Sequence, residues 1–493
     1  MQNVPTLKLG IVAVSRACFS KSLSSGRRDK VAAECAKLGL NIYNSQVLVE
    51  NEVDALAAIE DLRKNDVNAL VVYLGNFGPE TPETFMASKF EGPVMFAAAA
   101  EDSKNDLFDG RGDAYCGMLN ASYNLALRKL KVYIPDYPIG TPDEIAEKIV
   151  KFAPIARVMI ALRGLKIMSF GPRPDDFLAC NAPIKPLYDL GIAIQENSEL
   201  DLFQAYEAHK DDPRIPALVE EMKNDVACCA YPDILPRMAQ YELTLLDWAE
   251  KTKGASKYVT FATKCWPAFE SYFGFVPCYV NGRLAAKGYP VSCEVDIYGA
   301  LTEYIIAVAT DYAPALLDIN NSVPRDLYET YKANAKDYKL DDMFMGFHCG
   351  NGSACFLCNP DIKYQRIMKR DLEPDGEPDI TRGTMEGDIK ASPVTLFRLQ
   401  STADCQLRAY VAEGETLDIP TCSFGTIGIV AVKEMGRFYR HGLIEKNFPH
   451  HAGVAFSHCG KTLFEVLKLL GVTDIGYNRP AGCLYPTENP FEY

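Results

Sequence analysis

The chain lacks any uninterrupted run of 18 apolar residues, which is about the length that a helix needs to cross a bilayer. Its opening, MQNVPTLKLGIVAVS, also lacks the charged start, long apolar stretch and small-residue cleavage site of a secretory signal. The first absence excludes a transmembrane helix. The second predicts a protein that is not exported and works in the cytoplasm.

Three common motifs are missing as well. No GxGxxG follows the early apolar runs, so a dinucleotide site has no support. Gly460-Lys461-Thr462 resembles the end of a phosphate-binding P-loop, but that motif needs a glycine five residues earlier, where this chain has Ala455. No G-x-S-x-G with triad partners occurs. These absences disfavour dehydrogenase, kinase and serine-hydrolase chemistry.

Positive charge is in deficit, with 51 Lys and Arg against 65 Asp and Glu and a formal charge of −14. An acidic surface repels phosphate backbones, so nucleic acid is not expected as a partner. The 493 residues, 48% hydrophobic and 24% charged, are typical of a globular chain of about three domains. The 16 cysteines are scattered from Cys18 to Cys483, which predicts reduced thiols in a cytoplasmic protein.

The first half of the chain alternates short apolar runs with helical patterns. Strands are expected at residues 9–14, 69–74, 93–97, 166–171 and 258–262, and a long helix over residues 233–251. This alternation is typical of βαβ units around parallel sheets. Polar loops follow the first two runs at Ser15-Arg16 and Gly75-Asn76, which is where such sheets place ligands.

From about residue 390 the pattern changes, because apolar runs follow one another without helical segments. Strands are expected at residues 395–399, 407–411 and 428–432. Short turns, including Glu413-Gly414-Glu415, are expected to join them. This pattern favours an antiparallel sheet or barrel, followed by a helix over residues 462–470.

Histidine is scarce, with six residues in the chain, yet His450, His451 and His458 fall within nine residues. Imidazole is a common ligand for divalent transition metals, and the glycine and small residues between these histidines leave space for a substrate. The alternative is that one or two of them are ordinary core or surface histidines.

Two carboxylates have apolar surroundings. Glu294 begins an apolar, helix-like segment, and Asp318 follows an apolar run. An ionised carboxylate in such surroundings is costly unless it is paired or bound to a metal. Alternatively, Glu294 is a residue that interacts with a helix dipole, and Asp318 belongs to a turn or cap.

Together these segments resemble the metal-site segments of the L-fucose isomerase / L-arabinose isomerase family. The strings closest to its fucose-isomerase branch are Pro290-Val291-Ser292-Cys293-Glu294, His451-Ala452-Gly453-Val454-Ala455-Phe456-Ser457-His458 and Gly10-Ile11-Val12-Ala13-Val14-Ser15-Arg16. The resemblance implies an α/β fold class: two Rossmann-like α/β domains followed by a mostly antiparallel, β-barrel-like domain. The implied domains are residues 1–163, residues 164–312 with Glu294, and residues 313–493 with Asp318 and His451.

The resemblance also implies an activity. Family members are aldose–ketose isomerases that depend on a divalent metal, commonly Mn²⁺, and assemble as homo-oligomers, typically hexamers. Glu294, Asp318 and His451 would be the metal ligands. Glu294 and Asp318 would also be the catalytic pair that moves a proton between C1 and C2 through a cis-enediol. The expected substrate-binding residues are Arg16, Trp266, His348 and His458, with His348 alternatively a fourth metal ligand.

Departures from the family leave the sugar open. The chain is shorter than the typical fucose isomerase. Its second acid is Asp318, whereas the corresponding site in arabinose isomerases has two glutamates and two histidines. Arg16 could bind a sugar hydroxyl or an anionic group. The candidate substrates are therefore L-fucose, D-arabinose and a C6-modified hexose, either deoxy or sulfonated. The alternative functions are a non-catalytic sugar-binding protein and an epimerase or aldolase with the same metal site.

Overall fold

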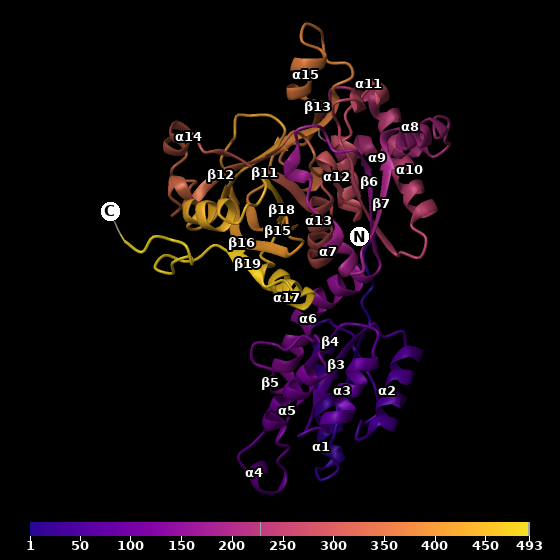
Figure 1. The fold of residues 1–493 in the computed structure, drawn as a ribbon, viewed down its shortest axis with the longest axis vertical. Helices are drawn as coiled ribbons and strands as arrows, with labels where there is room; N and C mark the ends of the chain where they lie inside the picture. Colours follow the sequence, from indigo (N-terminus) through magenta and orange to yellow (C-terminus); the bar gives the residue numbers. More distant parts are fainter. Residues whose placement is uncertain (227, 492–493) are drawn as a thin grey trace. The chain divides into compact units, whose positions relative to one another are not determined.

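The computed structural model describes residues 1–226 and 228–491, which form two compact units (Figure 1). The smaller unit contains residues 5–160 and a short contribution from residues 468–470. The larger unit contains residues 1–4, residues 161–467 and the chain from residue 471 onward. Among the helices that the structure describes, none is long and apolar enough to cross a membrane.

The smaller unit is built on a parallel sheet with the strand order β2-β1-β3-β4-β5. Its strands are β1 (Leu9–Val14), β2 (Tyr43–Asn44), β3 (Ala69–Leu74), β4 (Val94–Ala99) and β5 (Ile139–Gly140). Its helices are α1 (Lys21–Lys37), α2 (Glu52–Lys64), α3 (Glu80–Lys89), α4 (Asp106–Asp109), α5 (Ala114–Leu127) and α6 (Pro142–Arg163), the last of which continues into the larger unit. Strands β1, β3 and β4 are buried at every position, as expected when helices cover both faces of a parallel sheet. The first three predicted strands are confirmed.

The larger unit begins with a second parallel sheet, in the order β10-β9-β6-β7. Its strands are β6 (Leu165–Gly171), β7 (Ala193–Ser198), β9 (Tyr258–Ala262) and β10 (Val291–Ser292). The helices in this part of the chain are α7 (Lys185–Asp189), α8 (Glu199–Ala208), α9 (Ile215–Asp225), α10 (Leu235–Thr252), α11 (Phe269–Phe273), α12 (Cys278–Lys287) and α13 (Ile297–Thr310). The predicted strands near residues 166–171 and 258–262 and the long helix are confirmed.

A ten-stranded mixed sheet follows, in the order β19-β16-β15-β18-β11-β12-β17-β14-β13-β8. Its strands are β8 (Cys228–Cys229), β11 (Ala315–Ser322), β12 (Met343–His348), β13 (Asp361–Tyr364), β14 (Arg382–Asp388), β15 (Ser392–Ser401), β16 (Leu407–Leu417), β17 (Thr426–Ala431), β18 (His451–Ala455) and β19 (Asp474–Tyr477). The helices around it are α14 (Arg325–Thr330), α15 (Arg366–Leu372), α16 (Met435–Arg437) and α17 (Gly460–Leu470). Neighbouring strands are antiparallel in most of this sheet, and β16 pairs with β17 as well as with β15.

One predicted turn is wrong. Residues Glu413-Gly414-Glu415 lie inside β16, which continues to Leu417. A β-carbon at Gly414 would stand 2.1 Å from the carbonyl oxygen of Ala431 on β17. Gly414 is therefore required by the close approach of the β17 backbone and not by a turn, and such an approach is a common reason for a glycine within a strand.

Helix α13 lies between the two sheets of the larger unit. It contacts β9 and β10 of the parallel sheet and β15 and β18 of the mixed sheet. Every residue from Tyr298 to Ala309 is buried, and a helix enclosed on all sides needs apolar residues around most of its circumference. This central helix matters for the candidate site because it begins at Ile297, three residues after Glu294.

Candidate metal centre

Three neighbouring strands of the mixed sheet carry the first group of candidate ligands. Asp318 on β11 stands opposite His451, the first residue of β18, and opposite Phe347 on β12. His348, the last residue of β12, follows directly. Strand pairing therefore brings two histidines and an aspartate to neighbouring positions on three adjacent strands, although they are far apart in the sequence.

Glu294 reaches the same place from a short, strained turn between β10 and α13. Its φ is 51°, and Val295 follows with a φ of 57°. This left-handed conformation is unfavourable for residues other than glycine, and especially for a β-branched valine. The Val295 N–H donates a hydrogen bond of 2.8 Å to the carbonyl oxygen of Thr263, which holds the turn at the end of β9.

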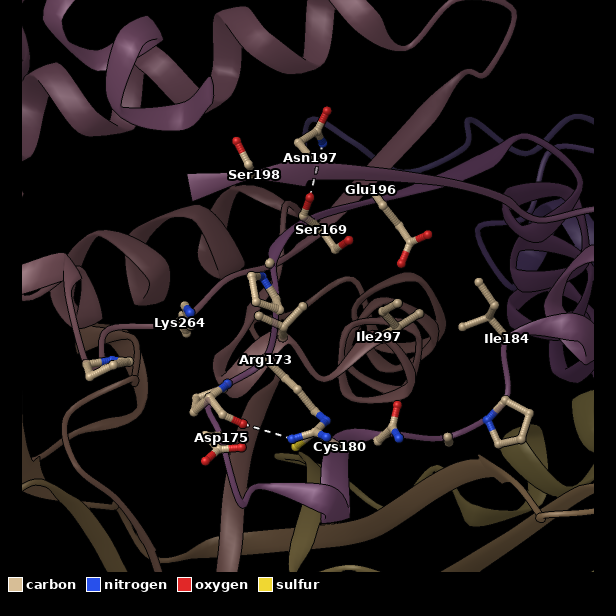
Figure 2. Close-up of a pocket in the computed structure, with 18 residues that line it drawn as sticks. Ser169, Arg173, Asp175, Cys180, Ile184, Glu196, Asn197, Ser198, Lys264 and Ile297 are labelled. Atoms are coloured by element: carbon tan, nitrogen blue, oxygen red, sulfur yellow. Dashed lines mark hydrogen bonds between the residues drawn. The ribbon is translucent and has the colours of Figure 1, made fainter. Parts of the chain in front are cut away.

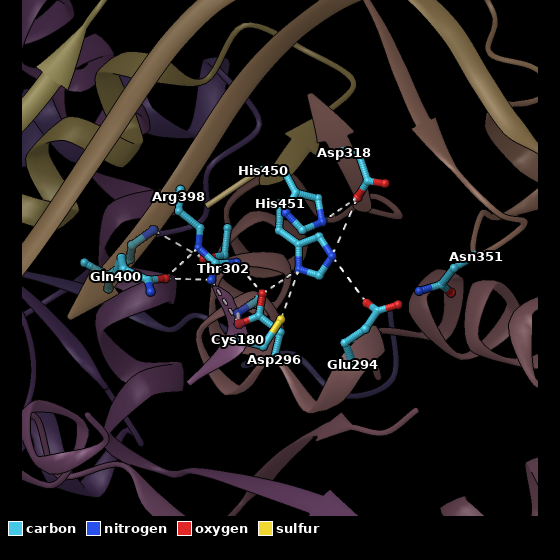
Figure 3. A network of polar contacts seen from close by, with 12 residues as sticks. Cys180, Glu294, Asp296, Thr302, Asp318, Asn351, Arg398, Gln400, His450 and His451 are labelled. Carbon is cyan, nitrogen blue, oxygen red and sulfur yellow. Dashed lines mark hydrogen bonds and ion pairs between the residues drawn. The ribbon is translucent and has the colours of Figure 1, made fainter. Parts of the chain in front are cut away.

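These side chains converge on one imidazole nitrogen (Figure 3). Nε2 of His451 lies 3.3 Å from Oε2 of Glu294 and 3.6 Å from Oδ1 of Asp318. Nε2 of His450 lies 3.5 Å from the same aspartate oxygen. One donor atom each from Asp318, His348 and His451 fall within 4.8 Å of one another, and His348 forms a second such group with Glu294 and Cys293.

The donor set fits a divalent metal ion. Glu294 Oε2, Asp318 Oδ1 and His348 Nδ1 are buried and have no hydrogen-bond partner among the described residues, which is rare for polar atoms without a ligand. Donors around an octahedral ion with bonds of about 2.1 Å stand about 3 Å apart, close to the distances from His451 Nε2. Carboxylate oxygens with imidazole nitrogens are donors that Mn²⁺ and similar ions accept.

The second nitrogen of the His451 ring, Nδ1, is held by a buried ion pair. Asp296 Oδ2 lies 2.8 Å from Nδ1, and Arg398 donates two hydrogen bonds, of 2.7 and 2.9 Å, to the same carboxylate (Figure 3). All three side chains are at most 2% exposed. Because a carboxylate only accepts, Nδ1 carries a proton, which leaves Nε2 as the nitrogen that can bind a metal.

The sequence analysis missed Asp296 and Arg398, although each had a signal. Asp296 precedes an apolar helical run, where an aspartate is a common N-cap, and its side chain accepts the Gly299 N–H at 2.8 Å. Arg398 is a charged residue inside the apolar run at 395–399, and such a residue is seldom buried without a partner.

The charges of the centre favour a cation. Burial by itself would raise the pKa of the Glu294 carboxyl, but the charge of the adjacent His451 ring holds this pKa below its ordinary value. Burial would lower the pKa of His451, yet its contacts with Asp296, Cys180 and Glu294 raise it well above the ordinary range. The imidazole and the carboxylates thus stabilise each other's charged forms, so the carboxylates favour a positive charge at this centre.

Trp266 joins this centre through Phe177, a residue that the sequence analysis did not select. The Phe177 ring centroid lies 6.0 Å from that of Trp266, 5.6 Å from His450 and 6.2 Å from His451. The Cys180 sulfur, three residues further on, lies 3.8 Å from Nδ1 of His451. The segment after β6 therefore places an aromatic ring and a thiol against the histidines.

Two predicted binding residues are not brought to the centre by any contact among the described residues. His458 Nε2 hydrogen-bonds the carbonyl oxygen of Gly414 at 2.9 Å. Arg16 belongs to the smaller unit, where its guanidinium pairs with Glu80 at 3.2 Å and lies 4.0 Å from the centre of the Phe77 ring. Its backbone N–H donates to Asn76, so the two predicted polar loops do meet at the end of the first parallel sheet. Their roles in binding stay predictions.

Comparison with known proteins points to one family. Residues 10–163 match the fucose/sulfoquinovose isomerase N-terminal domain, and residues 346–476 match the L-fucose isomerase C-terminal domain. Sulfoquinovose isomerase from Alkalicoccus urumqiensis is 26% identical over 341 residues, covering 68% of this chain and 70% of that protein. The enzyme of the same name from Priestia aryabhattai is 24% identical over 340 residues, with the same coverage.

A solved structure of a sugar ABC transporter from Actinomyces odontolyticus aligns with 62% of this chain and 84% of its own at 12% identity. Its TM-score of 0.15 is too low to bear on fold or function. His451 lies inside the matched C-terminal domain, whereas Glu294 and Asp318 lie between the two matched ranges. The inclusion of these two acids in the centre therefore rests on the geometry of this chain.

Proposed function

Since the chain belongs to the fucose-isomerase-like family, whose members interconvert aldoses and ketoses, we propose that it is a metal-dependent isomerase of a free monosaccharide. One observation supports the metal dependence above all others. Two buried carboxylate oxygens without hydrogen-bond partners among the described residues point at the same nitrogen of a histidine whose other nitrogen is held by Asp296. An arrangement of this kind is typical of a metal-ligating histidine.

We propose Glu294, Asp318 and His451 as the metal ligands, with Mn²⁺ as the ion. When bound, the metal stabilises the negative charge that develops on O1 and O2 of the sugar. The ion pair between Asp296 and Arg398 keeps the His451 ring fixed, so that the ligand does not have to reorganise during the reaction.

Glu294 and Asp318 are then the groups that move the proton. One carboxylate accepts the proton from C2 of the aldose, and the pair returns a proton to C1, while a hydroxyl proton passes from O2 to O1. The product is the ketose, and the intermediate is a cis-enediol. Both carboxylates have a second oxygen besides the one that faces His451, so each can hold a ligand position and still exchange a proton.

The sugar is proposed from the relatives. Both are named for sulfoquinovose, a hexose with a sulfonate at C6, which among the candidate substrates favours the C6-modified hexose over L-fucose and D-arabinose. Trp266 and His348 are proposed to contact the sugar, because Trp266 reaches the histidines through Phe177 and the two rings of His348 and His451 lie 6.2 Å apart. Arg16 and His458 remain proposed contacts on the family resemblance alone.

Product analysis tests the proposed reaction. The purified protein, loaded with Mn²⁺, is incubated in D₂O with a panel of aldoses that includes 6-sulfo and 6-deoxy hexoses. We expect accumulation of one ketose with solvent deuterium at C1, because the transferred proton visits a carboxylate that exchanges with water. A C2-inverted aldose without ketose would instead establish an epimerase. Binding of sugar without any product would establish a sugar-binding protein.

We propose that the chain forms a homo-oligomer, as the family resemblance implies, with a hexamer as the expected state. The support is an exposed apolar stripe on helix α5 of the smaller unit: Tyr115, Leu119, Tyr123 and Leu127 are each more than 60% exposed. They recur every four residues, so they share one side of the helix, and an exposed stripe of this kind is typical of an interface. Light scattering measures the mass, and a value near the 54.6 kDa of one chain would contradict the proposal.

Three further expectations remain proposals. The division of the larger unit into residues 164–312 and 313–493 is supported by its two separate sheets, although β8 pairs with a strand of the second one. Barrel-like closure is supported by the pairing of β16 with both β15 and β17. A cytoplasmic location is supported by the sixteen cysteines, all within the part of the chain that the structure describes, where none forms a disulfide.

A further inference from the structure

A large cavity lies beside the candidate metal centre, within the larger unit. Its volume is about 1010 Å³, and it shares two wall residues with the centre: Cys180, which touches His451, and Val295, which directly follows Glu294. The segment after β6, the end of β7 and the start of α13 supply most of the remaining wall (Figure 2). A sugar whose C1 and C2 lie at the metal centre has this space beside it.

Two cations, Arg173 and Lys264, line this cavity, and Arg173 is the one that forms no ion pair with a carboxylate among the described residues. Its guanidinium extends among the side chains that line the cavity (Figure 2). Among the described residues it donates a hydrogen bond of 2.9 Å to the carbonyl oxygen of Pro174. Asp175 and Glu196 also line the cavity, but neither forms an ion pair with it. The second cation, Lys264, is already paired with Glu199 at 3.0 Å.

Two deeply buried arginines of the larger unit show what the half-buried Arg173 lacks. Arg398 has both oxygens of Asp296, and Arg283 has Glu221, Asp225 and Glu242 as partners. A half-buried guanidinium without such a partner keeps its planar set of N–H donors available for an oxyanion.

Neutral polar groups stand around the same space. Asn181, Asn197, Ser169 and Ser198 all line the cavity. Of these, Asn197 already donates to the carbonyl oxygen of Ser169 at 3.1 Å, and the Ser198 hydroxyl donates to Asp201 at 2.9 Å. A tetrahedral oxyanion with three oxygens requires several hydrogen-bond donors at once. A guanidinium with nearby amides and hydroxyls supplies them, and a single neutral hydroxyl on the sugar would leave most of these donors without a partner.

We propose that Arg173 determines substrate specificity by binding an anionic substituent, of the sulfonate class, at the end of the sugar remote from C1 and C2. This inference rests on the proposed isomerase function and deepens it. Arg173 takes no part in proton transfer in this assignment. Its contribution is binding energy that a sugar without the anion does not receive.

The test compares two sugars that differ at C6 alone: glucose with a sulfonate at C6, and 6-deoxyglucose. Arg173→Gln is expected to lower kcat/KM for the sulfonated sugar by at least about 100-fold, mainly through KM, because one charge-assisted contact with an anion is lost. The value for 6-deoxyglucose should change by less than about threefold. Arg173→Lys should be more active on the sulfonated sugar than Arg173→Gln, since lysine keeps the positive charge but lacks the planar set of N–H donors of the guanidinium.

Arg325→Gln is the matched control, because Arg325 is an exposed arginine of the same unit that lines a different cavity, and both sugars should react as in the parent. Calorimetric Mn²⁺ binding to Arg173→Gln should equal that of the parent, which excludes a general loss of structure. An equal loss on both sugars, or no loss on either, would overturn the assignment. If the parent protein converts neither sugar nor any other aldose, the proposed isomerase function itself is wrong.

Discussion

Glu294→Gln is expected to lower kcat/KM for the aldose by about 10⁴-fold or more. The amide has nearly the same size as the carboxylate, but it has neither the negative charge that a metal ligand needs nor the ability to accept a proton. Loss of a general base alone costs about 10²–10⁴-fold, and the weakened metal site adds to that loss. Steady-state kinetics with Mn²⁺ in excess measure the effect on the reaction, and calorimetry measures Mn²⁺ affinity separately.

Glu270→Gln is the matched control, because Glu270 is another fully buried glutamate of the larger unit with no hydrogen-bond partner among the described residues. Burial raises the pKa of its carboxyl to about 8, so at neutral pH the group is mainly protonated and glutamine reproduces its shape and charge. We expect kcat/KM within about threefold of the parent. Activity of Glu294→Gln within tenfold of the parent would contradict both roles assigned to Glu294.

Removal of the metal is the second change with a large expected effect. Protein stripped with a chelator should retain less than about 1% of its activity, and added Mn²⁺ should restore it, because the charge that develops on O1 and O2 then has no counter-charge. Mn²⁺ at 100 times its Kd should also stabilise the folded state by about 2.7 kcal/mol. An upward shift in melting temperature would therefore accompany the return of activity. Full activity after complete removal would contradict the metal-dependent mechanism.

Asp296→Asn provides a graded version of the same experiment. The amide oxygen can still accept the Nδ1 hydrogen bond of His451, but the charge that orients and polarises the ring is lost. Such changes next to a ligand typically weaken metal affinity by about 10–100-fold. We expect high Mn²⁺ concentrations to restore most of the activity of Asp296→Asn and little of that of Glu294→Gln. Unchanged affinity would show that Asp296 does not position His451.

Much of the fold followed from local patterns. Apolar runs at residues 9–14 and 69–74 are strands, and the helix expected over residues 233–251 is α10. Buried parallel strands need apolar residues on both faces, so their sequences alone reveal them. The turn expected at Glu413-Gly414-Glu415 was wrong, since the reason for Gly414 is the approach of the β17 backbone, and a local sequence contains no information about a distant strand.

The kinds of chemical group at the candidate site could be predicted from local strings of residues. Glu294, Asp318 and His451 occur in strings that resemble one family of isomerases, and their side chains lie together in the structure. The groups that support these three side chains became visible in the folded chain alone, because they come from distant segments. Asp296 meets Arg398 across 102 positions and His451 across 155. Arg173 has no carboxylate partner among the described residues, and its guanidinium donates to the carbonyl oxygen of Pro174. A residue's type is local, whereas its partner and its burial depend on the packing of segments that are distant in the chain.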